Sequence, residues 1–214
     1  MGECLYVYPY RRGGISVGEI QKLSTLDETQ VNQAVGVFVE GFYNIFSSIS
    51  KDKAKLHKLF KASFNSNMVY VYVQDGAAVG FLGVRTAGDC PVKLNREVFL
   101  ETIRGFIGKV TFKVARAAMD AYNNANPVEA GGVFIDYLAI DPAYRGKGIG
   151  TKLIEYTREN LCQTYAMLDV LSYNKGAKKL YERMGFRVVR VRTNLIQILQ
   201  GLGKTITMRL DVAP

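Results

Sequence analysis

The chain has 214 residues and a formal net charge of +9, and its 48% hydrophobic and 22% charged residues are typical of one globular domain rather than a disordered chain. Its apolar runs are far shorter than the roughly 20 residues of a membrane span, it lacks a signal-peptide pattern, and its three scattered cysteines and single histidine exclude a disulfide framework and a zinc cluster. We therefore expect a cytoplasmic protein with a single domain over residues 1–214, no membrane partner and no metal site.

Secondary-structure signals in the N-terminal half alternate between strand and helix. Strands are marked by β-branched and aromatic runs, and helices by apolar residues at three- and four-residue steps. Asp27 or Thr25 can cap the first helix, and Gln74-Asp75-Gly76 between two β-rich runs is a strong hairpin signal. In chain order, the predicted elements are strands over 4–10 and 15–24, helices over 28–49 and 51–64, and hairpin strands on either side of 74–76.

The C-terminal half continues this mixture. A long helix is predicted over 95–123 from its apolar periodicity, although Gly105 and Gly108 weaken the prediction. The later elements are, in chain order, a central strand over 131–141, a helix over 149–161, a strand over 167–173, a helix over 175–184, and strands over 187–193 and 204–212. Helices and strands interleaved around one sheet, with hairpins at both ends, predict a mixed α/β (α+β) fold rather than a purely parallel sheet.

The positive charge is concentrated in one part of the chain. Between Pro142 and Arg192, eleven Lys and Arg residues face four Asp and Glu residues, a net of +7 that leaves only +2 for the remainder. A basic half built around a glycine-rich turn indicates a polyanionic ligand, whereas without the glycines an ordinary solvated surface would be expected. Nucleic acid is the competing ligand, but the stretch has no zinc-ligand spacing, helix-turn-helix or aromatic RNA-binding motif. We therefore expect no nucleic-acid partner.

The glycine-rich turn RGKGIG, residues 145–150, lies between the predicted central strand and the helix that follows it. Glycine permits positive φ and close approach to the backbone, and the N–H groups at a helix start are unpaired donors that favour negative charge. The spacing matches neither a Walker A loop nor a dinucleotide-binding fingerprint. Taken alone, the turn indicates a phosphate site or a plain strand-to-helix connection equally well.

A second stretch, LSYNKGAKKLYERMGF, places three residues of different chemistry on one helical face. Asn174, Ala177 and Tyr181 stand at i, i+3 and i+7. The small Ala177 permits close approach of a ligand, Asn174 offers an amide and Tyr181 offers a hydroxyl. The alternative is that Tyr181 is a core aromatic and Asn174 a helix cap.

Together the two stretches resemble the GNAT superfamily of acetyl-CoA-dependent N-acetyltransferases. The family's motif [RQ]-x-x-G-x-[GA], between a strand and a helix, is matched by Arg145, Gly148 and Gly150. Its companion motif N-x-x-A-x-x-L-Y-x-x-x-G-F is matched by Asn174, Ala177, Leu180, Tyr181, Gly185 and Phe186. The resemblance implies a single GNAT-like domain with a cofactor-binding core over about 132–187. It also implies a mostly antiparallel central sheet that is splayed at the cofactor site, with helices on both faces.

The resemblance further implies acetyl-CoA (coenzyme A) as the cofactor. Main-chain N–H groups of the turn would bind its pyrophosphate, and the central strand would pair with its pantetheine arm. The residues that the resemblance places at the cofactor are Leu138, Ala139, Ile140, Arg145, Gly146, Lys147, Gly148, Ile149, Gly150, Thr151, Asn174, Ala177 and Tyr181.

The implied reaction is attack of an amine on the thioester, and three residues are the catalytic candidates. The amide of Leu138 would hold the carbonyl oxygen as negative charge builds there, and Tyr181 would donate a proton to the departing thiolate. Asp136 shares the face of Leu138 in a regular strand, so it is a candidate general base, directly or through water. The alternative for Asp136 is a polar side chain satisfied by backbone groups.

The chain departs from the family pattern in a helical insertion over about 89–129, before the central strand. This insertion is expected near the acceptor end of the cleft or at a homodimer face, with a solvent-capping helix as the alternative. The apolar stretch 194–204 is a further candidate wall of the acceptor pocket. We expect a small-molecule primary amine as the acceptor; acetylation of a protein N-terminus or lysine, and a non-catalytic CoA-binding sensor, are the alternatives.

Overall fold

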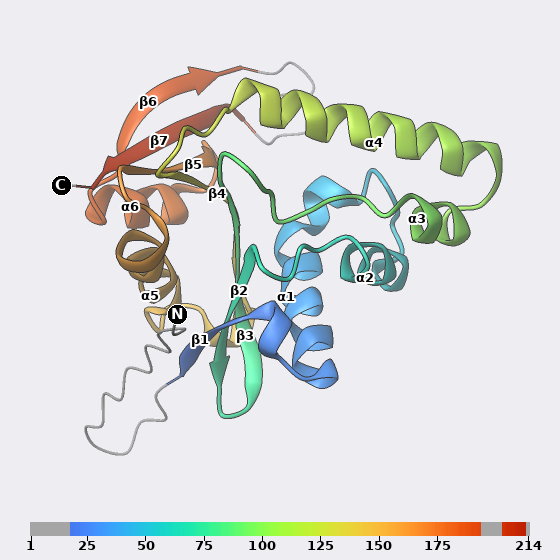
Figure 1. Cartoon of the computed structure of the whole chain (residues 1–214), viewed down its shortest axis with the longest axis horizontal. Helices are drawn as coiled ribbons and strands as arrows, with labels where there is room; N and C mark the ends of the chain where they lie inside the picture. The colour runs from blue at the N-terminus through green and yellow to red at the C-terminus, as the bar shows by residue number, and fades with distance from the viewer. Residues whose placement is uncertain (1–17, 194–202, 213–214) are drawn as a thin grey trace.

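The computed structural model describes residues 18–193 and 203–212, in which seven strands form one sheet (Figure 1). The strand order is β1-β2-β3-β4-β5-β7-β6, and every neighbouring pair is antiparallel except β4–β5. The strands are β1 (Glu19–Lys22), β2 (Val69–Gln74), β3 (Ala77–Arg85), β4 (Gly132–Ile140), β5 (Tyr165–Leu171), β6 (Arg187–Arg192) and β7 (Thr205–Asp211). The mixed, mostly antiparallel sheet predicted from the sequence is confirmed, while the strand predicted over 4–10 lies outside the described residues.

Helices cover both faces of the sheet (Figure 1). The helices are α1 (Glu28–Phe46), α2 (Lys53–Lys61), α3 (Arg96–Thr102), α4 (Gly105–Ala125), α5 (Ile149–Tyr156) and α6 (Lys175–Arg183). One face packs against α5 and α6, and the other packs against α1 and α2. This arrangement, with a helical insertion before β4, agrees with the predicted fold class.

Local side-chain chemistry explains where the elements begin and turn. Asp27, rather than Thr25, caps α1: its carboxylate accepts from the Gln30 amide at 2.8 Å, and the Gln30 side chain accepts from the Asp27 amide at 3.3 Å. The predicted hairpin forms between β2 and β3, and its turn residues Asp75 and Gly76 have φ values of 53° and 76°. Positive φ at both turn positions matches the twist of the paired strands.

An aromatic cluster on the α1 face fixes the position of β4. The fully buried Phe38 ring has its centroid 4.8 Å from that of Phe60, 5.0 Å from that of Phe81 and 5.1 Å from that of Tyr137 on β4. Aromatic pairs at these separations contribute beyond the area they bury. Strand alternation then sends the Leu138 side chain to the opposite face, where it packs in the core beneath α5.

The helix predicted over 95–123 is two helices, because the chain breaks after Thr102. Ile103 has the extended φ of −112°, and Gly105 has a φ of 78°, which favours glycine. The new helix α4 buries only Gly108 and Phe112, whereas Phe106 is 80% exposed. In α4 the apolar periodicity therefore does not mark a buried face, whereas Phe99 of α3 is buried. Figure 1 shows α4 running outward from the sheet, beyond α3.

Candidate active site

The strands β4 and β5 separate after only four paired residues. Their pairing runs from Gly132 with Tyr165 to Ile135 with Leu168, whereas β4 continues to Ile140 and β5 to Leu171. Beyond this point β4 pairs only with β3, and β5 only with β7. The main-chain edge of β4 that faces β5 is therefore open past Ile135, which confirms the predicted splay of the sheet.

The turn after β4 presents a continuous run of free N–H groups. Main-chain amides from Gly146 to Thr151 have no hydrogen-bond acceptor within the described ranges. Gly146 and Gly148 have φ values of 76° and 78°, and a Cβ added at either would meet no atom within 4 Å. The space around these glycines is open, and α5 begins at Ile149. Unpaired amides and the positive end of a helix dipole together form a site for an anion.

Cationic side chains of the turn are anchored around these amides. The Nε of Arg145 donates to the Ile140 carbonyl oxygen at 3.1 Å, which ties the turn back to the end of β4. The Nζ of Lys147 lies 4.5 Å from the centroid of the Tyr144 ring. The Ile140 carbonyl, one of the groups predicted to meet the cofactor, thus already accepts one hydrogen bond. Ala139 packs instead toward α1, where a Cβ added at Gly41 would lie 2.7 Å from its own Cβ.

Helix α6 brings the second motif beside the turn. A Cβ added at Gly150 would lie 3.4 Å from Leu180, so the first turn of α5 packs directly against α6. Asn174 caps α6, because its Oδ1 accepts from the Ala177 amide at 3.1 Å. Asn174 is therefore a helix cap, which was one of the two roles considered for it from the sequence.

Tyr181 is both a core aromatic and a group that reaches the surface. Its residue is only 7% exposed, and its ring lies 6.0 Å from that of Phe186. Burial raises the pKa of Tyr181 to about 12. Its hydroxyl has no hydrogen-bond partner among the described residues. Every fully buried side-chain nitrogen or oxygen atom in this part of the chain has such a partner, so the hydroxyl oxygen is not fully buried. The hydroxyl must therefore contact solvent.

Asp136 does not share the face of Leu138, which corrects the expectation for a regular strand. The β3–β4 register shifts between Gly83, opposite Tyr137, and Val84, opposite Ile135, so Asp136 is the extra residue of a β-bulge. A bulge inserts one residue and re-aims the side chains that follow it. The carboxylate therefore lies on the α4 side of the sheet, while Leu138 packs beneath α5.

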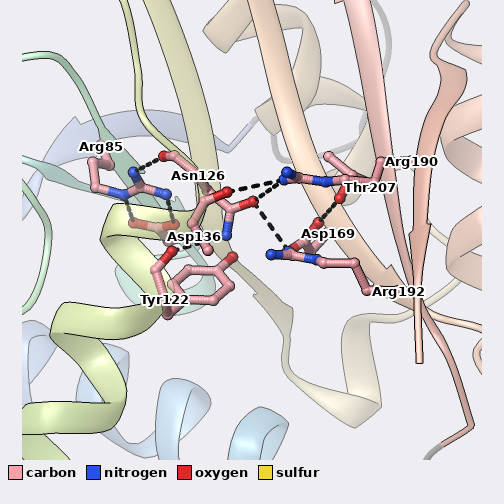
Figure 2. Close-up of polar contacts among 9 residues, drawn as sticks. Arg85, Tyr122, Asn126, Asp136, Asp169, Arg190, Arg192 and Thr207 are labelled. Atoms are coloured by element: carbon pink, nitrogen blue, oxygen red, sulfur yellow. Dashed lines mark hydrogen bonds and ion pairs between the residues drawn. The ribbon is translucent and has the colours of Figure 1, made fainter. Parts of the chain in front are cut away.

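Arg85, which the sequence analysis did not single out, binds Asp136 with two hydrogen bonds (Figure 2). The Nε–Oδ2 distance is 3.0 Å and the Nη2–Oδ1 distance is 3.1 Å, and the two side chains are 6% and 5% exposed. Burial raises the pKa of Asp136 to about 6; Arg85 opposes this shift, and the nearby Asp169 adds to it. The only signal in the sequence was a basic residue at the end of an apolar strand.

The same arginine belongs to a polar network at the point where β4 and β5 separate (Figure 2). Its Nη1 donates to the main-chain oxygen of Asn126, just after α4. The Asn126 side-chain oxygen accepts from Arg190 at 2.6 Å and from Arg192 at 3.1 Å. Arg192 also binds Asp169 of β5 at 2.7 Å. The insertion is thereby joined to strands on both sides of the split.

Two surface hollows lie away from Tyr181 and Asp136. One of about 620 Å³ runs along α3 and α4, and one of about 270 Å³ lies between α1, the start of β3 and residues 141–144.

Within residues 18–193 and 203–212, no group of His, Cys, Asp and Glu side chains could hold a metal ion. No helix of that part is long and apolar enough to cross a membrane.

Comparison with known proteins connects this geometry to a family. The profile of the Acetyltransferase (GNAT) family matches residues 38–186. Over 80 residues the chain is 31% identical to the ribosomal protein bS18-alanine N-acetyltransferase of Salmonella typhimurium, an alignment that covers 36% of this chain and 53% of that protein. The chain thus matches about half the length of this curated relative.

Solved structures share the fold at low sequence identity. The ribosomal-protein-S18-alanine N-acetyltransferase of Escherichia coli superposes with a TM-score of 0.54 and 16% identity, covering 92% of this chain and 96% of that one. An N-acetyltransferase from Staphylococcus aureus Mu50 gives 0.53 and 13%, covering 90% and 100%. The family profile spans most of the chain and includes both the anion-binding turn and α6. The chain therefore belongs to the acetyltransferase (GNAT) family.

Proposed function

We propose that this protein is an N-acetyltransferase that moves the acetyl group of acetyl-CoA to a primary amine. The observation that carries the proposal is the run of free amides from Gly146 to Thr151, beside the split between β4 and β5. These amides fit a diphosphate, and the open edge of β4 fits an extended pantetheine chain. When bound, acetyl-CoA supplies a thioester that an amine can attack. Membership of the GNAT family supports the same cofactor.

Three groups of the chain would act at the reacting atoms. The main-chain N–H of Leu138 would donate to the thioester carbonyl oxygen as negative charge grows there. The Tyr181 hydroxyl would donate to the departing sulfur, and Asp136 would accept a proton from the acceptor nitrogen. In balance, a C–N bond forms, the C–S bond breaks, the nitrogen loses a proton and the sulfur gains one.

We propose a small-molecule primary amine as the acceptor, within a single domain whose insertion borders the acceptor side. A protein N-terminus is a second candidate, favoured by the relative that acetylates an alanine of ribosomal protein bS18. A homodimer remains a prediction, and the exposed apolar side chains of α4, such as Phe106, are the surface that it would use.

Acetyl-CoA binding is the first test. At a hundredfold excess of acetyl-CoA over its Kd, the free energy of unfolding should rise by about 2.7 kcal/mol, measured as a thermal shift. A panel of small primary amines and alanine-led peptides, followed by thiol release, would then distinguish the two acceptor classes. The absence of a thermal shift would contradict the proposed function, and a shift without turnover of any amine would favour a CoA sensor.

Asp136→Asn tests the proposed base through pH. Because the pKa of Asp136 is raised to about 6, kcat/KM should rise through pH 6 as the carboxylate forms, and the variant should lack this limb. The folded pKa exceeds the unfolded value of about 3.9, so the folded state holds the proton between about pH 4 and 6. The wild-type protein should therefore lose stability as the pH rises through this window, and the variant should not.

The matched control is Asp120→Asn, which changes an exposed carboxylate 3.7 Å from Arg116. Its pH profile should equal that of the wild-type protein. An acid limb that persists in Asp136→Asn would assign that limb to another group.

A further inference from the structure

The last turn of α4 is fixed at the split by Asn126, a residue only 1% exposed. Its main-chain oxygen accepts from Arg85, and its side-chain oxygen accepts from Arg190 and Arg192. Its Nδ2 donates to the main-chain oxygen of Tyr122 at 3.0 Å, one turn earlier in α4. Tyr122 is therefore held in a defined position relative to β3 and β6.

Tyr122 shares Arg85 with Asp136. The guanidinium carbon of Arg85 lies 5.7 Å from the Tyr122 ring centroid and 4.7 Å from that of Phe134, and the two rings are 6.2 Å apart. The same guanidinium binds the Asp136 carboxylate (Figure 2). Figure 2 shows the Tyr122 ring extending from α4 toward the split, between the Arg85–Asp136 pair and Asp169.

The hydroxyl of Tyr122 is unpaired although its ring is packed. It has no hydrogen-bond partner in the described part of the chain. Every fully buried side-chain polar atom there has a partner, so this hydroxyl oxygen is not fully buried and contacts solvent. Burial, reinforced by the carboxylates of Asp136 and Asp169, raises the pKa of Tyr122 well above its usual range. The side chain therefore stays a neutral phenol, which can both donate and accept a hydrogen bond.

We propose that Tyr122 binds the amino group of the acceptor beside Asp136, so that the helical insertion supplies the acceptor subsite. This inference rests on the proposed acetyl transfer. The phenol oxygen accepts a hydrogen bond from the acceptor's N–H, on the α4 side of β4, where the bulge also directs the Asp136 carboxylate. The insertion then has a chemical role in addition to its structural one.

The charges around this subsite define the class of acceptor. Three arginines, Arg85, Arg190 and Arg192, face two carboxylates, Asp136 and Asp169, which leaves a net charge of +1 in the network. The reacting amino group is neutral when it attacks and is not repelled by this excess, whereas a second, cationic amino group on the same molecule is repelled. The acceptor is therefore a primary monoamine and not a polyamine.

The test is Tyr122→Phe, which removes only the unpaired hydroxyl. Thiol release is measured with n-butylamine and with L-alanine amide, and the faster of the two gives the saturation curve. We expect the amine KM to rise about two- to tenfold, because a hydrogen bond between the neutral phenol and the neutral amino group is lost. The kcat, the acetyl-CoA thermal shift and the Tm should stay near their wild-type values, since the hydroxyl has no protein partner to lose.

Tyr70→Phe is the matched control. The Tyr70 hydroxyl has no partner in the described ranges and a pKa raised to about 12 by burial, but it lies on β2, two strands from β4, and packs against Tyr156. This variant should leave the amine KM unchanged. For the charge argument, n-butylamine is compared with 1,4-diaminobutane, and the monoamine should have the higher kcat/KM.

Results that differ from these expectations would overturn the acceptor subsite, the acceptor class or the proposed function. An unchanged amine KM in Tyr122→Phe overturns the acceptor subsite, and so does a normal acetyl-CoA shift without turnover of either monoamine. A fall in Tm larger than that of Tyr70→Phe means a structural role and overturns it as well. A preference for 1,4-diaminobutane overturns the acceptor class. If the wild-type protein shows no shift with acetyl-CoA, the proposed function itself fails.

Discussion

Tyr181→Phe is expected to lower kcat by about ten- to ten-thousandfold, the range for loss of a positioned proton donor, while the acetyl-CoA thermal shift stays at its wild-type value. Helix α6 holds the ring against Phe186, and the neighbouring Leu180 packs against the first turn of α5. Burial raises the pKa of Tyr181 to about 12, above the roughly 8.5 of a thiol. Complete proton transfer before C–S cleavage is therefore uphill, and the hydroxyl would act by hydrogen bonding to sulfur as its charge grows.

Single-turnover and steady-state thiol release, measured on the same preparation, would place the loss at the chemical step. Tyr156→Phe is the control, because Tyr156 is also a tyrosine whose pKa burial raises, but it packs against Tyr70 on β2. That variant should keep its kcat. An unaltered kcat in Tyr181→Phe would remove Tyr181 from the mechanism, and a lost thermal shift would reassign it to cofactor binding.

Arg85→Met is expected to lower the free energy of unfolding by about 3–5 kcal/mol near neutral pH, because it leaves the buried Asp136 carboxylate without its partner. Arg85 lowers the pKa of Asp136, so its removal should raise that pKa further above 6. Below the new pKa the carboxyl is neutral and the loss of stability should be smaller; it should grow as the pH rises through that value. Urea unfolding at pH 5 and pH 8 would measure both effects.

Two further variants test whether the loss of stability comes from the unpaired carboxylate of Asp136. Arg116→Met breaks an exposed pair with Asp120 on α4, whose side chains are 68% and 63% exposed, so it should cost less than about 0.5 kcal/mol. Asp136→Asn, added to Arg85→Met, should restore part of the stability because the uncompensated charge is gone. Wild-type stability in Arg85→Met at pH 8 would mean that the pair contributes nothing to the fold.

Local signals in the sequence were sufficient for most of the fold. The cap at Asp27, the Asp75-Gly76 turn and the apolar run of β4 each act within a few residues, and the structure has an element at each place. The segment predicted as one helix over 95–123 forms two helices, because the chain is extended at Ile103 and Gly105 takes a positive φ. Of the stretch 194–204, a predicted wall of the acceptor pocket, residues 194–202 lie outside the described residues.

The sequence by itself determined the parts of the site that depend on contiguous residues. The turn over 145–150 is such a part, because glycine conformation and free helix-start amides are local properties. Only the tertiary structure decided what surrounds Asp136. A bulge that depends on the register with β3 moved its carboxylate to the α4 side, and an arginine 51 positions earlier paired with it. Neither leaves a periodic trace, because strand register and long-range ion pairs arise only when distant segments pack together.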